Sequence, residues 1–316
     1  MVNFSYNLSP TIRDNLDKIK DLRSQVLLTV LPPRFELQLR WEATINKIYW
    51  SLSLTENPVS RRQIVKLLTL ANKRRFTSQE KEVINYKKAL AYISQEWTAN
   101  SAATTAKHIL LVDSLAYGAR LTKRYSQLLL PVWEKFLQYL QTGSDHPVIQ
   151  AGVAQINLSS LSPVPEDDGR TARLVGLLLL YKYGYDLRGL IELEEYFRRN
   201  IVDYNKTQES VKSNQNLTLW LEFYTEAVKI QFTKILSKIS SGQFQITTAS
   251  NFWKLNDRQK QIMVLLEQPN ISITNKKVQG LFRVSQITAS RDLAKLTSLG
   301  LLFSHGKGRS VYYTKV

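Results

Sequence analysis

Apolar residues recur at three- and four-residue spacing over much of the chain, with polar residues between them, and this spacing is the period of an α-helix. Seven stretches show it: 34–49, 79–95, 127–141, 148–158, 170–183, 192–210 and 217–238. Proline and glycine interrupt the pattern at 31–33, 56–58, 143–147 and 163–169, where we expect turns. The pattern predicts a mainly α-helical body.

After a polar segment at 239–250, the last part of the chain carries a different pattern. A helix starts in the polar cap at 255–260, a second helix is predicted at 275–282, and a third at 287–299 ends at Gly300. Two short apolar strands follow, at 301–304 and 310–314, joined by a basic turn rich in glycine. Three helices and a β-hairpin in this order are typical of a winged helix-turn-helix domain.

The net charge is unevenly distributed along the chain. The 316 residues carry +17 in total, of which residues 251–316 hold +8, nearly half of the charge in a fifth of the length. This concentration of positive charge indicates a small nucleic-acid-binding module attached to a more neutral body. A basic excess is also compatible with a solvated surface that binds nothing in particular.

The predicted winged helix suits double-stranded DNA, because a recognition helix enters the major groove and basic side chains meet the phosphates. Winged helices also serve as dimerisation or protein-docking modules, and this alternative stays open. We expect a homodimer, since operator half-sites demand paired modules. The candidate DNA-binding residues lie on the third helix and in the basic turn: Ser285, Gln286, Thr288, Ser290, Arg291, Lys295, Lys307 and Arg309.

Several kinds of chemistry are excluded by residues that the chain lacks. It has no cysteine, which removes disulfides, thiol nucleophiles and zinc sites with cysteine ligands. The three histidines, His108, His146 and His305, are widely spaced and match no metal-ligand pattern. The longest apolar run is far shorter than a bilayer span, and no stretch resembles a signal peptide. We therefore expect a cytoplasmic protein with no membrane partner.

The segment 146–174 resembles the core of the Fic family. From Ser162 it runs Ser-Pro-Val-Pro-Glu-Asp-Asp-Gly-Arg-Thr-Ala-Arg, against the family signature His-Pro-Phe-x-Asp/Glu-Gly-Asn-Gly-Arg-x-x-Arg. Segments 196–204, 220–224 and 255–259 fall in register with the same family. The resemblance implies a Fic-like helical body with an N-terminal region at 1–105 and a core at 106–240, then a linker at 241–254 and a winged-helix DNA-binding domain at 255–316.

Fic proteins commonly transfer AMP from ATP to a hydroxyl of a target protein with the help of magnesium, and the resemblance assigns roles to the motif. The general base of the family is a histidine, and Ser162 stands in its place. Serine cannot deprotonate an alcohol unaided. Glu166 occupies the position of the magnesium ligand. The resemblance places Gly169, Arg170 and Arg173 at the positions that hold phosphate. The two arginines, spaced i and i+3 beside the acidic residues, are equally compatible with internal ion pairs.

Other parts of the family machinery also depart from the pattern. Asp167 and Asp168 replace residues of the phosphate cradle; they would repel a triphosphate but favour an empty helix N-terminus. The segment 112–125, where a β-hairpin flap would lie, is short and basic. The self-inhibitory motif is off pattern, because Glu56 is preceded four residues earlier by Leu52.

These departures predict a catalytically inactive Fic-like protein that requires no cofactor and regulates transcription by binding DNA through its winged helix. The alternative is an active or altered adenylyltransferase that uses Glu166, Arg170 and Arg173 with ATP and Mg²⁺ on a protein target. A protein-interaction scaffold is a third possibility.

Overall fold

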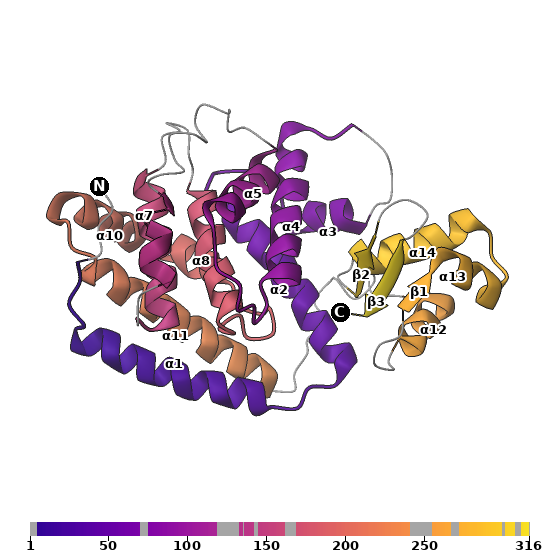
Figure 1. Cartoon of the computed structure of the whole chain (residues 1–316), viewed down its shortest axis with the longest axis horizontal. Coiled ribbons are helices and arrows are strands. Elements are labelled where there is room, and N and C mark those ends of the chain that lie inside the picture. The colour runs from indigo at the N-terminus through magenta and orange to yellow at the C-terminus, as the bar shows by residue number, and fades with distance from the viewer. Residues whose placement is uncertain are drawn as a thin grey trace.

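Helices dominate the computed structural model, and the predicted mainly α fold is confirmed (Figure 1). The structure describes residues 5–69, 75–118, 133–134, 136–141, 145–161, 169–240, 255–266, 272–298, 301–306 and 311–315. The helices of the body are α1 (Pro10–Leu28), α2 (Pro33–Ser53), α3 (Arg61–Thr69), α4 (Ser78–Glu96), α5 (Ala106–Tyr117), α7 (Pro147–Leu161), α8 (Arg170–Lys182), α9 (Leu193–Arg199), α10 (Ile201–Asn214) and α11 (Thr218–Ser240).

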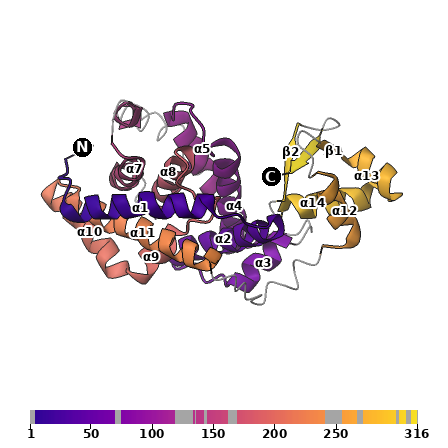
Figure 2. The same ribbon diagram turned by 90° about the horizontal axis from the view of Figure 1, so that it is seen from below.

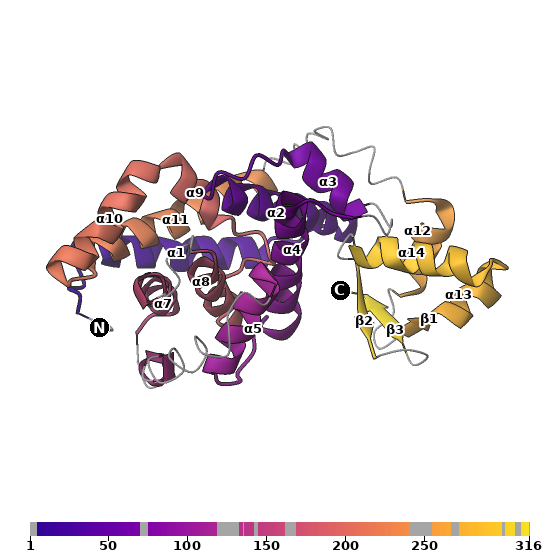
Figure 3. The same ribbon diagram turned by 90° about the horizontal axis from the view of Figure 1, so that it is seen from above.

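Helix α8 is the centre of the body. Every residue from Arg170 to Tyr181 is buried, which explains the apolar run of this segment, since a helix that is apolar all round is a buried one. Helix α7 packs along it, α4 and α5 cover it from another side, and α1 lies along α11 (Figures 1 and 3). Among the described residues no helix is both long and apolar enough to cross a membrane.

Helix α7 closely approaches α11 at Gly152. A Cβ atom at this position would lie only 2.9 Å from Cδ1 of Tyr224 and 3.0 Å from Cδ2 of Leu221. The carbonyl oxygen of Gly152 accepts a hydrogen bond of 2.8 Å from the indole nitrogen of Trp220. Glycine therefore allows the two helices to approach until an aromatic residue of α11 can bond to the backbone of α7.

Most predicted helices are confirmed, with differences at particular residues. The expected single helix 192–210 is wrong, because the chain breaks at Asn200 into α9 and α10. The Asn200 side chain donates 2.9 Å to the carbonyl of Tyr196, while its own carbonyl accepts from Tyr204 and starts α10. Of the predicted helix 127–141, residues 133–134 and 136–141 are described, and they are helical. Ile239 and Ser240 belong to α11 rather than to the polar link, and residues 241–254 lie outside the described chain.

The C-terminal module, residues 255–315, lies at one end of the body (Figures 1 and 2). It consists of α12 (Asp257–Leu265), β1 (Ser272–Thr274), α13 (Asn275–Phe282), α14 (Gln286–Ser298), β2 (Leu302–His305) and β3 (Tyr312–Lys315). The strands form an antiparallel sheet in the order β1-β3-β2. This arrangement is consistent with a winged-helix-like end. Strand β1 was not predicted, and it completes the sheet by pairing with β3.

Candidate functional site

A cleft of about 460 Å³ opens where the central helix α8 begins. The end of α2, the end of α7, and helices α9 and α10 form its other walls. The lining residues are Ser53, Leu54, Glu56, Ser159, Gly169, Arg173, Arg198, Ile201, Tyr204, Asn205, Gln208 and Lys212. The Fic-like motif predicted from the sequence therefore borders a real cavity.

Positive charge prevails in this cleft. Arg173, Arg198 and Lys212 line it, against Glu56 as the one carboxylate among the lining residues that the structure describes. Gly169 has φ +71°, and a Cβ atom there would lie 3.2 Å from Nη1 of Arg173. Glycine thus lets the guanidinium lie against the backbone at the start of α8. The cleft is chemically suited to an anion such as a phosphate group.

Arg170 and Arg173 are one turn apart on α8 but have different surroundings. Arg170 is 2 % exposed and donates 3.1 Å to Oε2 of Glu82 and 3.4 Å to Oγ1 of Thr55. Its guanidinium also lies 4.8 Å from the ring centre of Tyr117. Arg170 therefore ties α8 to α4 and α5, whereas Arg173 belongs to the lining of the cleft.

The module presents a second candidate surface along α14. Ser285 caps this helix, because its Oγ accepts 3.2 Å from the backbone N–H of Thr288. Gln286, Ser290 and Arg291 are exposed, and Lys295 is half-buried. The inner face holds the residues predicted for it, Ala289, Leu293 and Leu296. The structure thus brings the predicted residues of the third helix together on one side, while Lys307 and Arg309 lie outside the described residues.

Residues that sequence reasoning missed add to this surface. Ile287 is 65 % exposed in the first turn of α14, and Lys276 and Lys277 are exposed at the start of α13. The sequence could have shown that Ile287 is exposed, because position 287 falls outside the helical spacing that places residues 289, 293 and 296 on the inner face. The two lysines lie in the first turn of the second predicted helix.

The whole arrangement matches solved structures of Fic proteins. A Fic family protein from Desulfovibrio desulfuricans G20 aligns with 98 % of this chain and 97 % of its own at a TM-score of 0.62 and 15 % identity. A fragment of Fic-1 from C. elegans aligns with 71 % of each chain at a TM-score of 0.58 and 16 % identity. A Fic domain containing signaling protein from Bacteroides thetaiotaomicron VPI-5482 covers 73 % of this chain and 97 % of its own, with a TM-score of 0.54 and 16 % identity. The chain has the Fic fold. No protein-family model matches the sequence.

In the Fic-fold body, the histidine nearest the motif in sequence lies far from the cleft. His146 precedes α7, and its Nδ1 accepts 3.2 Å from the backbone N–H of Val148, while Nε2 lies 3.1 Å from the hydroxyl of Tyr185. Burial, then the charge of Arg23, lowers the pKa of His146. Ser159 borders the cleft at the other end of α7. At a rise of 1.5 Å per residue, His146 and Ser159 are about 20 Å apart along the helix. His146 therefore lies at the start of α7, away from the cleft.

Two predicted residues of the Fic motif have no described position. Ser162 and Glu166, with the intervening turn and the acidic pair 167–168, lie outside the described residues. Their roles as the lost base position and the magnesium ligand stay predictions. Of the short segment 112–125 expected in place of a flap, residues 112–117 belong to α5, which Gly118 ends with φ +76°.

A buried pair of polar side chains, Tyr86 and Glu194, joins α4 to α9. The hydroxyl of Tyr86 donates 2.9 Å to Oε1 of Glu194. Burial raises the pKa of Tyr86 and the charge of Glu194 raises it further, while Ser51 and Arg173 act in the opposite direction. Tyr86 therefore stays protonated and can serve as a fixed hydrogen-bond donor to Glu194.

Proposed function

We propose that this Fic-fold protein binds double-stranded DNA through its C-terminal module, acts as a transcriptional regulator, and does not transfer AMP. The observation that carries the proposal is the polar, solvent-exposed half of α14, on which Gln286, Ser290 and Arg291 are all exposed. Glutamine and arginine are the side chains that pair in bidentate fashion with adenine and guanine in the major groove.

The helix pair α13 and α14 is held in a fixed relation. Nδ2 of Asn275 donates 2.7 Å to Oγ of Ser290 and 3.3 Å to the carbonyl oxygen of Gln286. Because these hydrogen bonds already fix α13 relative to α14, little conformational freedom of the helix pair would be lost on binding DNA. Lys276 and Lys277 follow Asn275 and are exposed, so they add two cations to the first turn of α13.

The end of α14 that would enter a groove points away from the body. Thr297 and Ser298, at its C-terminal end, line a cavity together with body residues such as Arg40. Gln286 therefore lies at the opposite end of a 13-residue helix, about 18 Å away at 1.5 Å per residue. This orientation leaves room for a duplex beside the module.

The test is a fluorescence-anisotropy titration of the full chain with a pool of random duplexes over a series of salt concentrations. We expect binding whose affinity falls steeply with salt, because each neutralised phosphate releases condensed counterions. Arg291→Ala is expected to weaken binding, whereas Lys206→Ala, which removes an exposed charge from α10, is expected to leave it unchanged. Absence of duplex binding at low salt, or equal loss in both variants, overturns the proposal.

The proposed lack of AMP transfer rests on Ser162 at the position of the family base. The cleft supports retention of anion binding, because Arg173, Arg198 and Lys212 line it. Incubation with labelled ATP and Mg²⁺ is expected to leave the chain and added proteins unlabelled. Incorporated label that Arg173→Ala abolishes would establish the alternative, an active or altered adenylyltransferase.

We also propose that the regulator binds DNA as a homodimer, since paired modules match paired half-sites. Sedimentation of the full chain with a bound duplex is expected to show two chains per DNA molecule. A single chain at saturation contradicts this part of the proposal and leaves DNA binding itself intact.

A further inference from the structure

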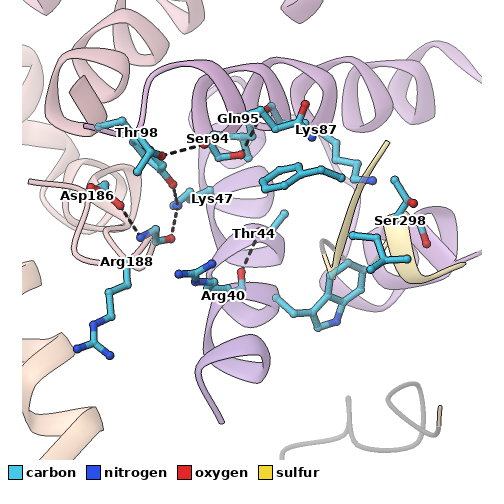
Figure 4. A pocket seen from close by; sticks show the side chains of 18 residues that line it. Arg40, Thr44, Lys47, Lys87, Ser94, Gln95, Thr98, Asp186, Arg188 and Ser298 are labelled. Carbon is cyan, nitrogen blue, oxygen red and sulfur yellow. Dashed lines mark hydrogen bonds between the residues drawn. The ribbon is translucent and has the colours of Figure 1, made fainter. Parts of the chain in front are cut away.

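A second cavity, of about 430 Å³, lies where the body meets the C-terminal module (Figure 4). We name it the junction cavity. Helices α2 and α4 and the segment after α8 form its body side, and the end of α14 and strand β2 form its module side. Its lining residues are Arg40, Trp41, Thr44, Lys47, Lys87, Leu90, Ala91, Ser94, Gln95, Thr98, Tyr181, Asp186, Arg188, Gly189, Thr297, Ser298, Leu302 and Phe303.

Cations outnumber anions around the junction cavity. Arg40 and Arg188 share a single carboxylate, Glu36, at 2.6 and 3.4 Å. Lys47 is buried and donates 2.6 Å to the carbonyl oxygen of Gly189, and its positive charge acts on the carboxyl group of Asp186. Even with these pairs formed, the lining keeps an excess of positive charge.

Lys87 contributes part of this excess. Within the described chain it forms neither a hydrogen bond nor an ion pair, and it is half-buried, with burial lowering the pKa of its ammonium group. An ammonium removed from water without a partner is costly, so it is an unusual group to find in a cavity wall. Figure 4 shows Lys87 and Ser298 toward the same end of the cavity.

The remaining walls supply apolar and hydrogen-bonding surface. Trp41 and Leu90 contribute from the body, and Leu302 and Phe303 contribute from the module. Ser94, Gln95 and Thr98 add polar groups along one side of α4 and its end (Figure 4). A cavity of a few hundred Å³ with apolar walls and a few convergent polar groups is typical of small-molecule sites.

We propose that the junction cavity binds a small organic anion with a flat apolar part, whose charged group pairs with Lys87 and whose apolar part contacts Trp41 and Phe303. Because the occupant touches both the body and the module, it fixes one relative to the other. If the proposed DNA-binding function holds, the occupant also changes the affinity for DNA, and this last step rests on that function.

The binding test uses 8-anilinonaphthalene-1-sulfonate, a singly charged aromatic anion, as the probe on the full chain. We expect saturable binding of one molecule per chain, with energy transfer from tryptophan. Lys87→Met is expected to weaken it by at least about tenfold, corresponding to the loss of one buried charge pair. The matched control is Lys88→Met, because Lys88 is the next residue of α4 and is exposed.

Two further measurements separate this site from general attraction of the probe to apolar surface. The uncharged analogue N-phenyl-1-naphthylamine is expected to bind wild type and Lys87→Met equally. Ser298→Trp, which places an indole in the cavity, is expected to abolish binding of the charged probe. Equal affinity of the charged probe for Lys87→Met and Lys88→Met, or unchanged binding to Ser298→Trp, overturns the site.

A DNA titration with and without saturating probe tests the coupling separately. We expect the duplex affinity to change in wild type and to stay unchanged in Lys87→Met. Probe binding without such a change overturns the coupling alone. Lack of any DNA binding overturns the proposed function while leaving the anion site standing on the direct binding measurement.

Discussion

The guanidinium of Arg258 on α12 donates to the buried carboxylate of Asp292 on α14. Nε2 of Gln259 donates to the same carboxylate over 2.7 Å, and Nδ2 of Asn256 over 3.4 Å. Burial alone would raise the pKa of Asp292, but these three bonds hold it below the ordinary value of 3.8. One acid therefore joins the first helix of the module to the proposed recognition helix.

Asp292→Asn is expected to lower the free energy of unfolding of the module by about 1–3 kcal/mol, because the charge-assisted bonds to Arg258 and Gln259 are lost. Since folding depresses the pKa of Asp292, its contribution is complete above pH 3.8 and is lost as the pH falls below that value. Hydrogen exchange of α14 between pH 3 and 7 measures both effects. Asp17→Asn on the exposed side of α1 is the control, and equal protection of α14 in both variants contradicts the assignment.

Gly152→Ala is expected to destabilise the body, because its Cβ would meet the ring of Tyr224 at 2.9 Å and would separate α7 from α11. Overpacking of this kind costs about 1–3 kcal/mol.

Gly280→Ala is the matched control, since nothing lies within 4 Å of a Cβ in its place on α13. That substitution is expected to stabilise by about 0.5–1 kcal/mol, as alanine replaces glycine inside a helix. Thermal unfolding monitored by circular dichroism should shift in opposite directions for the two variants, and a shared direction contradicts this account of the α7–α11 contact.

Arg170→Ala is expected to reduce stability by about 1–3 kcal/mol, because it removes the bonds to Glu82 and Thr55 and the contact with Tyr117. Arg62→Ala, an exposed charge on α3, is expected to change stability by less than about 0.5 kcal/mol. Urea unfolding of both variants checks this. An Arg170→Ala protein as stable as wild type would show that the guanidinium is not a structural tie, and would return it to the candidates for phosphate binding.

Sequence periodicity predicted most helices of the body and missed α1, α3 and α5. In α1 a polar residue interrupts the buried face. Helix α1 buries Ile12 and Ile19 but also Asn15, which donates 3.2 Å to Thr225 on α11. A polar residue that is satisfied only by a partner 210 positions away breaks the local pattern. Strand β1 was missed for a related reason, since its three residues become a strand only by pairing with β3.

For the cleft, the sequence identified the segment but not the direction of its side chains. Spacing of three residues places Arg170 and Arg173 on one side of a helix, and a surface helix would present both to the same ligand. Helix α8 is buried all round, so the neighbouring helices determine what each arginine contacts. Glu82 comes from α4 and Lys212 from α10, and no local pattern predicts which of them faces which arginine.

Lys87→Met is expected to raise the stability of the chain by about 1 kcal/mol, because it removes a half-buried charge that has no partner among the described residues and keeps most of the apolar stem. The folded state holds the proton of Lys87 less tightly than the unfolded state, so wild type gains stability as the pH rises toward 10.5. Lys87→Met lacks the titrating group, so its stability does not show this gain with rising pH. Melting temperatures from pH 7 to 10 check the prediction against Lys88→Met, and a lower stability of Lys87→Met at pH 7 contradicts it.

Ile287→Ala separates recognition of bases from attraction to phosphates. Ile287 is 65 % exposed in the first turn of α14, where a side chain without charge has no phosphate to neutralise but can contact a thymine methyl group. Once a preferred duplex has been selected from the random pool, the variant is expected to lose about 1 kcal/mol of affinity for it and nothing for random DNA. Its salt dependence should equal that of wild type, because the substitution removes no charge. A changed slope in Ile287→Ala, or equal losses on both kinds of DNA, would mean that α14 lies along the backbone rather than in the groove.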